Sequence, residues 1–474
     1  MWKLLERFGV LGIQFVLQII LARLLSPELY GVLTLMIVFT QLANIFIQTG
    51  FNTALVQNKD VTEEDYSSVF WVTLAVALLL YGILFAAAPA IAAFYHMPDF
   101  VWPFRVLCLV LFPGAYNSIQ IAKVSRKMNF KKVFYSNVFG ILLAGVAGIV
   151  IALLGGGLWA LVAQNLLNVL LACVVMAFTV KWRPHLVLNM SRIKVLFSYG
   201  WKLLGSGLLD TLYQNLQSLV IGKKYDSSTL AFYDRGKQFP QYGITAITSS
   251  VQSVLLPAMA AEQDDLSRVK WMTRNSVMMS SYVIFPMMAG LAGVAEPLIK
   301  LLLTDKWIAC VPFMQICCIT YAFYPVYTSN LQAIKAIGRS DIFLKLEIIK
   351  KIFGIVVLAI AVFCFETPLA IALTGVISIP FDLLINAYPN KKLIDYSFFE
   401  QMKDILPSAF VSMLMMLGVL AVGKLNLPIV VLLIIQVILG AALYILLSLV
   451  LQLAPFKLLL TRLKQFQIGK RKGA

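Results

Sequence analysis

The stretch SVFWVTLAVALLLYGILFAAAPAIAAF, residues 68–94, holds no charged side chain and decides the fold class. About 20 consecutive apolar residues are enough for a helix to cross the hydrocarbon core of a bilayer. The stretch therefore predicts a membrane-spanning helix. Its apolar residues are continuous, whereas the strands of outer-membrane barrels alternate apolar and polar residues. We expect an all-α membrane protein.

The whole chain shares the composition of this stretch. Of its 474 residues, 60% are hydrophobic and only 13% are charged, about half the charged fraction of a soluble domain. A water-soluble fold of this size cannot bury so much apolar surface. The composition excludes a cytosolic enzyme, a secreted domain and a disordered protein, and it indicates a polytopic helical membrane protein.

Working outward from 68–94, the same length criterion predicts about 14 spans. They lie near 8–25, 30–50, 68–94, 103–121, 135–154, 158–180, 197–222, 236–258, 275–303, 307–334, 346–364, 367–388, 405–423 and 427–453.

Basic residues predict the orientation of these spans. Most of the 39 Lys and Arg residues fall in the N-terminus, the even-numbered loops and the C-terminal tail. Short loops rich in Lys and Arg are usually cytoplasmic, so we expect both termini in the cytoplasm. The net charge of +17 fits this rule together with contacts to anionic lipid headgroups. Membrane lipids are therefore expected partners, and nucleic acid is not.

The chain repeats itself at two offsets. At an offset of 200, Gln14 aligns with Gln214 and Arg23 with Lys223; at 212, Lys123 aligns with Lys335. Two offsets in the right order predict two six-helix lobes that enter the membrane in the same sense, followed by a two-helix tail. Chance similarity between hydrophobic helices is the alternative. The expected domains are an N-terminal lobe at 1–180, a cytoplasmic linker at 181–196, a C-terminal lobe at 197–388, and a tail with a basic C-terminus at 389–474.

The linker is basic and amphipathic. Its cations are Lys181, Arg183, Arg192 and Lys194. Such a pattern predicts a helix that lies on the inner leaflet of the membrane.

Three segments resemble a known family. They are FGVLGIQFVLQIILARLLSPELYGVLTL (8–35), GFNTALVQ (50–57) and YGWKLLGSGLLDTLYQNLQSLVIGKKYDSSTLAFYDRGKQFP (199–240). They look like polysaccharide exporters of the multidrug/oligosaccharidyl-lipid/polysaccharide superfamily. The resemblance is strongest to Wzx-type lipid-linked oligosaccharide flippases of the colanic-acid and teichuronic-acid exporter branch.

This resemblance implies a V-shaped arrangement of two lobes around a cavity that opens to each side in turn. It also implies a substrate, an undecaprenyl-pyrophosphate-linked repeat unit flipped from the cytoplasmic to the periplasmic leaflet of the bacterial inner membrane. Such exporters supply capsule, exopolysaccharide or O-antigen assembly, so polysaccharide polymerase machinery is an implied partner.

Polar side chains inside the spans predict where a headgroup could cross. A sugar pyrophosphate loses its water in hydrocarbon, so the protein must offer a polar path. The candidates share helical faces within the first, second and seventh spans: Gln14 and Gln18; Gln41 and Asn44; Asp210, Gln214 and Gln217. Hydrogen bonding between helices is the alternative role for such residues.

Asp210 lies roughly 20 Å from the cytoplasmic end of its span, at about 1.5 Å per residue. An ionisable residue at this depth is a functional hypothesis by default. It could bind a coupling cation, exchange a proton or pair with a basic residue. Glu347 lies close to Lys345, Lys350 and Lys351 along the eleventh span and can form i, i+3 or i, i+4 pairs there. For Asp382, nearer the cytoplasmic end, we favour a structural role.

Basic residues predict a pyrophosphate entry site. Lys123, Arg126 and Lys127 lie at the expected cytoplasmic rim of one lobe, and Lys335 and Arg339 lie at the rim of the other. Arg and Lys suit pyrophosphate, and Arg can bind it through two parallel bonds. Arg23, near the outer end of the first span, could receive the headgroup there. Ordinary topology signals and lipid contacts are the alternative roles.

No enzyme signature is present in the sequence. Gly155-Gly156-Gly157 is not followed by the Gly-Lys-Ser/Thr of a phosphate-binding loop, so we expect neither a cofactor nor ATP hydrolysis. A coupling ion, H⁺ or Na⁺, stays open. The alternatives to a flippase are a cation-coupled drug or metabolite antiporter of the same superfamily, and a membrane enzyme such as a glycosyltransferase or polymerase.

Overall fold

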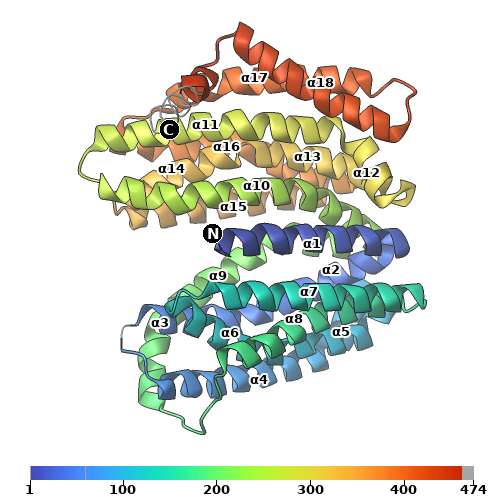
Figure 1. Cartoon of the computed structure of the whole chain (residues 1–474), viewed down its shortest axis with the longest axis vertical. Helices are drawn as coiled ribbons and strands as arrows, with labels where there is room; N and C mark the ends of the chain where they lie inside the picture. Colours follow the sequence, from blue (N-terminus) through green and yellow to red (C-terminus); the bar gives the residue numbers. More distant parts are fainter. Residues whose placement is uncertain (1, 59, 462–474) are drawn as a thin grey trace, which may run out of the picture. The chain divides into compact units, whose positions relative to one another are not determined.

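The computed structural model describes residues 2–58 and 60–461, and this part of the chain contains helices and no strand (Figure 1). The first helices are α1 (Trp2–Leu24), α2 (Pro27–Gln48), α3 (Gly50–Gln57), α4 (Glu63–Tyr95), α5 (Val101–Leu107), α6 (Leu111–Arg126), α7 (Phe130–Leu153), α8 (Leu158–Val180) and α9 (Met190–Lys224). Then follow α10 (Ser227–Ala261), α11 (Leu266–Gly293), α12 (Ala295–Leu303), α13 (Val311–Ala322), α14 (Tyr324–Ala336), α15 (Ser340–Cys364), α16 (Pro368–Ile394), α17 (Phe398–Val422) and α18 (Ile429–Val450). Single 3-10 turns are η1 (Pro98–Phe100), η2 (Cys108–Val110) and η3 (Asp305–Cys310).

Eleven helical segments of the described chain are long and apolar enough to cross a membrane. Every predicted span lies on helical structure, so the prediction of an all-α polytopic membrane protein is confirmed, with 14 as an approximate count. Of the predicted spans, those in α1, α9 and α15 do not meet the criterion of length and apolarity. The ninth predicted span, 275–303, is interrupted, because α11 ends at Gly293 and α12 begins at Ala295.

Helix ends recur along the chain in the order that the repeat predicts. The break between α1 and α2 at residues 25–26 has a counterpart between α9 and α10 at 225–226. The break between α6 and α7 at 127–129 has a counterpart between α14 and α15 at 337–339. The first pair keeps the offset of 200, and the second differs by two residues from the offset of 212. This order supports two related halves.

The chain forms two compact units, Met1–Asp234 and Arg235–Ala474. The division lies inside α10 and not in the linker 181–196, because α9 packs against α2, α3 and α4. The proposed lobe limits at 180 and 197 stay a prediction.

The expected linker helix is wrong for residues 181–189, which are not helical; α9 begins only at Met190. Groups of this segment bond to side chains of α4, and one backbone bond, from the Val187 amide to the His185 carbonyl at 2.9 Å, lies within the segment. The amides of His185 and Asn189 donate to the hydroxyls of Ser67 and Ser68 at 3.1 and 3.0 Å. Because both serines are fully buried, they hold this non-helical segment against α4.

Glycines set the closest helix contact of the first unit, between α7 and α8. A Cβ atom on Gly140 would lie 2.9 Å from the backbone oxygen of Asn168, and one on Gly148 would lie 2.9 Å from Cβ of Gln164. Small residues let helices approach closely in membranes, where packing replaces the hydrophobic driving force.

In the second unit, α17 packs along α11 and α18 packs along α17 (Figure 1). Hydrogen bonds from tyrosine side chains join these apolar helices. The Tyr282 hydroxyl donates to Ser448 at 3.1 Å, and the Tyr444 hydroxyl donates to the Tyr282 carbonyl at 2.7 Å. The two-helix tail is thus an integral part of this unit.

Candidate functional site

The predicted polar face of α9 is present, and its deepest members are exposed. Asp210 and Gln214 are exposed, and Gln217 is half-buried and accepts a hydrogen bond from the Tyr233 hydroxyl. Asp210 lies well inside a 35-residue helix. An ionisable group at such a depth faces a protein interior or a water-filled space in membrane proteins, since contact with lipid is costly.

The candidate residues of α1 and α2 are less uniform. Gln14 and Gln18 are half-buried on α1. On α2, Gln41 is exposed, whereas Asn44 is half-buried and donates to the Thr40 carbonyl of its own helix at 3.1 Å. The assembly of these side chains with α9 into one cavity stays a prediction.

Arg23 and its repeat partner Lys223 both lie in the last turn of their helices. Arg23 is exposed. Lys223 donates to the Phe94 carbonyl at 2.5 Å and lies 4.2 Å from the centre of the Phe94 ring. A cation at a helix C-terminus is stabilised by the helix dipole, so Lys223 has a structural role at this end of the first unit.

Part of the basic cluster of the first unit makes contacts within the protein. Lys123 forms an ion pair with Glu63 at 2.6 Å and lies 5.3 Å from the Tyr66 ring. Arg126 donates to the Leu55 carbonyl at 3.3 Å while remaining exposed, and Lys127 is exposed. Arg126 and Lys127 are therefore the members that present charge to solvent.

The basic cluster of the second unit is similar in kind. Lys335 lies 4.0 Å from the Phe343 ring. Arg339 donates two parallel bonds to Asp341, both 2.9 Å long. These bonds lower the pKa of Asp341 to about 2. Asp341 neutralises much of the charge that Arg339 was expected to offer a pyrophosphate.

Two polar networks were not predicted from the sequence. In the first unit, Arg192 donates to both carboxylate oxygens of Asp65 at 3.0 and 2.9 Å and to the Asp60 carbonyl at 2.6 Å. Asp65 is only 2% exposed and also accepts the Thr62 amide at 2.9 Å. The Thr62–Asp65 capping box was the sequence signal for a helix start here; the Arg192 contact, over a hundred residues away, had none.

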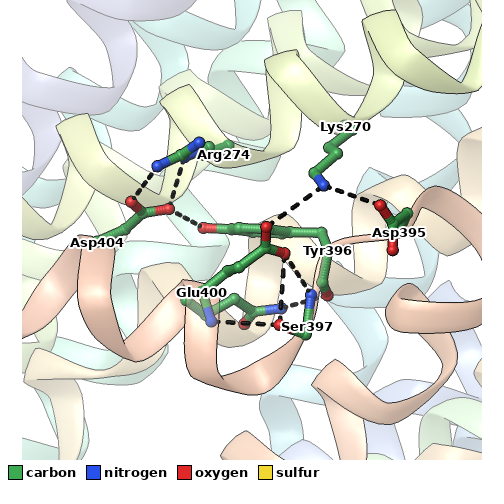
Figure 2. Close-up of polar contacts among 8 residues, drawn as sticks. Lys270, Arg274, Asp395, Tyr396, Ser397, Glu400 and Asp404 are labelled. Atoms are coloured by element: carbon green, nitrogen blue, oxygen red, sulfur yellow. Dashed lines mark hydrogen bonds and ion pairs between the residues drawn. The ribbon is translucent and has the colours of Figure 1, made fainter.

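The second network joins α11 to the connection between α16 and α17 (Figure 2). Arg274 donates to both oxygens of Asp404 at 2.8 and 2.7 Å. Lys270 lies 3.4 Å from Asp395 and 3.5 Å from Glu400. The network fixes the start of α17 on α11.

One predicted pair is confirmed. Glu347 accepts a hydrogen bond from Lys350, three residues later on α15, at 2.5 Å. Glu347 and Lys350 therefore pair with each other within α15, which we expect to cross the membrane.

Comparison with known proteins decides the family. Residues 20–312 match the model of a family described as polysaccharide biosynthesis protein. The chain belongs to this family. This match confirms the family that the resemblance predicted.

Individual relatives of this chain also have names from polysaccharide biosynthesis. The succinoglycan biosynthesis transport protein ExoT of Rhizobium meliloti is 25% identical over 341 residues, covering 72% of this chain and 69% of that one. The teichuronic acid biosynthesis protein TuaB of Bacillus subtilis is 26% identical over 305 residues, covering 64% and 63%. Among solved structures, the lipid II flippase MurJ superposes with a TM-score of 0.77 at 13% identity, covering 94% and 98%. The last likeness establishes a shared fold.

Proposed function

We propose that this protein flips an undecaprenyl-pyrophosphate-linked oligosaccharide repeat unit from the cytoplasmic to the outer leaflet by alternating access. Membership of a polysaccharide biosynthesis family supports the proposal. So do a relative named as a succinoglycan transport protein and a fold shared with a lipid II flippase. The exported repeat unit would serve capsule, exopolysaccharide or O-antigen assembly.

The observation that carries the proposal is the exposed polar face of α9. Asp210 and Gln214 lie one turn apart and are both exposed, in the 35-residue helix α9, which we expect to cross the membrane. Lipid around a carboxylate is unfavourable, so this face must border water. A hydrated path allows the sugar and pyrophosphate to keep polar contacts while the polyprenyl tail stays in lipid.

The exposed cations supply the anion-binding part. Arg126 and Lys127 of the first unit would meet the pyrophosphate at the cytoplasmic rim through charge-assisted bonds. Arg339 of the second unit would do so only where a phosphate displaces Asp341 from its guanidinium. Gln41, Gln214 and Gln217 would exchange hydrogen bonds with sugar hydroxyls during passage. No bond of the substrate is broken, so the protein acts as a transporter without a catalytic residue.

The same proposal gives the protein its place in the cell. It would lie in the bacterial cytoplasmic membrane with both termini in the cytoplasm, as its loop charges predict. Transport would draw on H⁺ or Na⁺, with Asp210 as a group that could bind either ion, and the exported unit would pass to a polymerase.

A complementation experiment tests the function. Bacterial strains that each lack one defined flippase, with known repeat units, would receive the gene. We expect surface polysaccharide to return in at least one strain and the lipid-linked unit to leave the cytoplasmic leaflet. Efflux of cationic drugs without any polysaccharide export would instead favour the antiporter alternative.

A further inference from the structure

A stripe of polar residues runs along one face of α16, inside the second unit. Asp382, Asn386 and Asn390 are each four residues apart, so they share that face. Asn386 and Asn390 are fully buried. The corresponding face of α8, at the offset of 210 that relates the starts of these two helices, has Ala172, Met176 and Val180. The stripe is therefore a feature of the second half of the chain and not of the repeat.

One end of the stripe is hydrogen-bonded. The Asn390 amide donates to the Asn330 side chain at 2.7 Å, and the Asn330 amide donates to Gln401 at 2.8 Å. The Gln401 amide donates to the Tyr396 carbonyl at 3.4 Å. Asn330 and Gln401 are fully buried.

A second set of bonds, on the side chain of Tyr396, reaches the protein surface. The Tyr396 hydroxyl donates to Asp404 at 2.9 Å, and Asp404 is held by Arg274, whose side chain is 47% exposed (Figure 2). Polar groups thus run from solvent to Asn390 through contacts between α11, α17, α14 and α16.

The other end of the stripe has no such partners. Among the described residues, neither side-chain atom of Asn386 has a hydrogen-bond partner, nor do the side-chain oxygen of Asn390 and the hydroxyl of Tyr327. Buried polar atoms in native proteins are almost always satisfied by protein or by ordered water. Four such atoms close together need a common explanation.

Helix register brings these atoms to one place. Asn330 contacts Asn390, Tyr327 lies one turn before Asn330, and Asn386 lies one turn before Asn390. These steps of three and four residues are about 4.5 and 6 Å along their helices. Asp382 is near enough to act electrostatically on Tyr327. The carboxyl of Asp382 also interacts with Lys350 and Glu347 of α15, so three helices meet around it.

We propose that the interface between α14 and α16 in the second unit is a binding site for ordered water, held by Asn386, Asn390 and Tyr327. This water continues the bonded chain from Asn390 to the Asp382 carboxyl. A water is stable in a buried site that is polar and offers two to four partners, and the four unbonded atoms supply them.

The water site has a consequence for Asp382. Its carboxyl would contact water that is bonded, through Asn390, to the buried amides of Asn330 and Gln401. The role of this residue then extends beyond packing, because its carboxyl would be part of a hydrated polar network inside the unit. This proposal stands independently of the substrate that the protein carries.

Replacing Asn386 by Leu, a side chain of similar volume, distinguishes a wet site from a dry one. In a dry site, Asn386→Leu removes an unsatisfied amide and raises the melting temperature. In a hydrated site, the variant loses several hydrogen bonds, and we expect the melting temperature of the purified full-length protein to fall by roughly 2–4 °C or more. A rise, or no change, would overturn the proposal.

Asn330→Leu is the matched control, because its amide is bonded to protein and its loss lowers the melting temperature whether or not water is present. Should Asn386→Leu fail to fold, a high-resolution cryo-EM map of the unaltered protein gives the answer. Density for a water within hydrogen-bond distance of the Asn386 amide is expected. A direct protein partner for that amide, or no density where other buried waters are resolved, would refute the site.

Discussion

At the scale of single residues, the exposed groups of α9 differ from the buried groups of the networks in what they can do. Substitution of Asp210 or Gln214 should have little effect on stability, because both side chains are exposed. Asp65 is buried and bonded by Arg192, so its removal affects stability. Transport and stability should therefore respond to different substitutions.

Substitution of Gln214 by Leu tests the transport path. The side chain is exposed, so the amount of protein in the membrane should stay unchanged, while loss of a polar group from the hydrated face should reduce polysaccharide export about tenfold, equivalent to about 1.4 kcal/mol. Export is measured as surface polysaccharide per cell at matched protein level. Leu212→Ala, at an exposed apolar position of the same helix, is the control and should export normally. Equal export by both variants would remove Gln214 from the path.

Replacement of Arg192 by Met tests the contact that docks the linker. The variant would leave Asp65 buried without its cation, which is unfavourable, so we expect a lower melting temperature. Arg183→Met, at an exposed position of the same linker, is the control and should melt like the unaltered protein. If Arg192→Met were as stable as the control, the ion pair would not hold the linker.

At the scale of elements, close helix approach depends on glycines whose surroundings differ. Gly140 faces a backbone oxygen of α8, whereas nothing lies within 4 Å of a Cβ placed on Gly82 of α4. The same substitution should therefore have opposite effects at the two positions.

Gly140→Ala should destabilise the first unit, because a Cβ contact of 2.9 Å with Asn168 backbone requires α7 and α8 to separate. Gly82→Ala should be neutral or stabilising by about 0.5–1 kcal/mol, since glycine inside a helix costs that much relative to alanine. Melting temperatures of both variants in one detergent measure the effect. Similar shifts for the two would show that α7 and α8 do not pack as described.

At the scale of the whole molecule, the loop charges and the helix order together predict a topology. Each unit carries an exposed basic cluster, and the relation between helix breaks at 25–26 and 225–226 supports halves with the same sense of insertion. Both termini on one side require an even number of spans.

Reporter fusions test this topology. A fluorescent protein joined after Ala474 should fluoresce, because it folds in the cytoplasm, and alkaline phosphatase inserted in the loop 423–428 between α17 and α18 should be active outside. Reporter activity is measured in intact cells, with the loop 181–189 as a cytoplasmic control position. The reverse pattern would invalidate the orientation, and with it the cytoplasmic placement of Arg126 and Arg339.

The sequence by itself determined the membrane class, the approximate positions of the long helices, the order of two repeat offsets, and the position of Glu347 within one helical turn of several lysines. Long apolar runs and neighbours on one helical face are local properties, so they can be read along the chain. Only the tertiary structure decided that residues 181–189 are not helical, that Arg192 holds Asp65, that Arg339 is bonded to Asp341, and that the Asn386 amide has no partner among the described side chains. Most of these features depend on contacts between residues that are far apart in the sequence. Hydrophobic periodicity carries no information about which polar groups make such contacts.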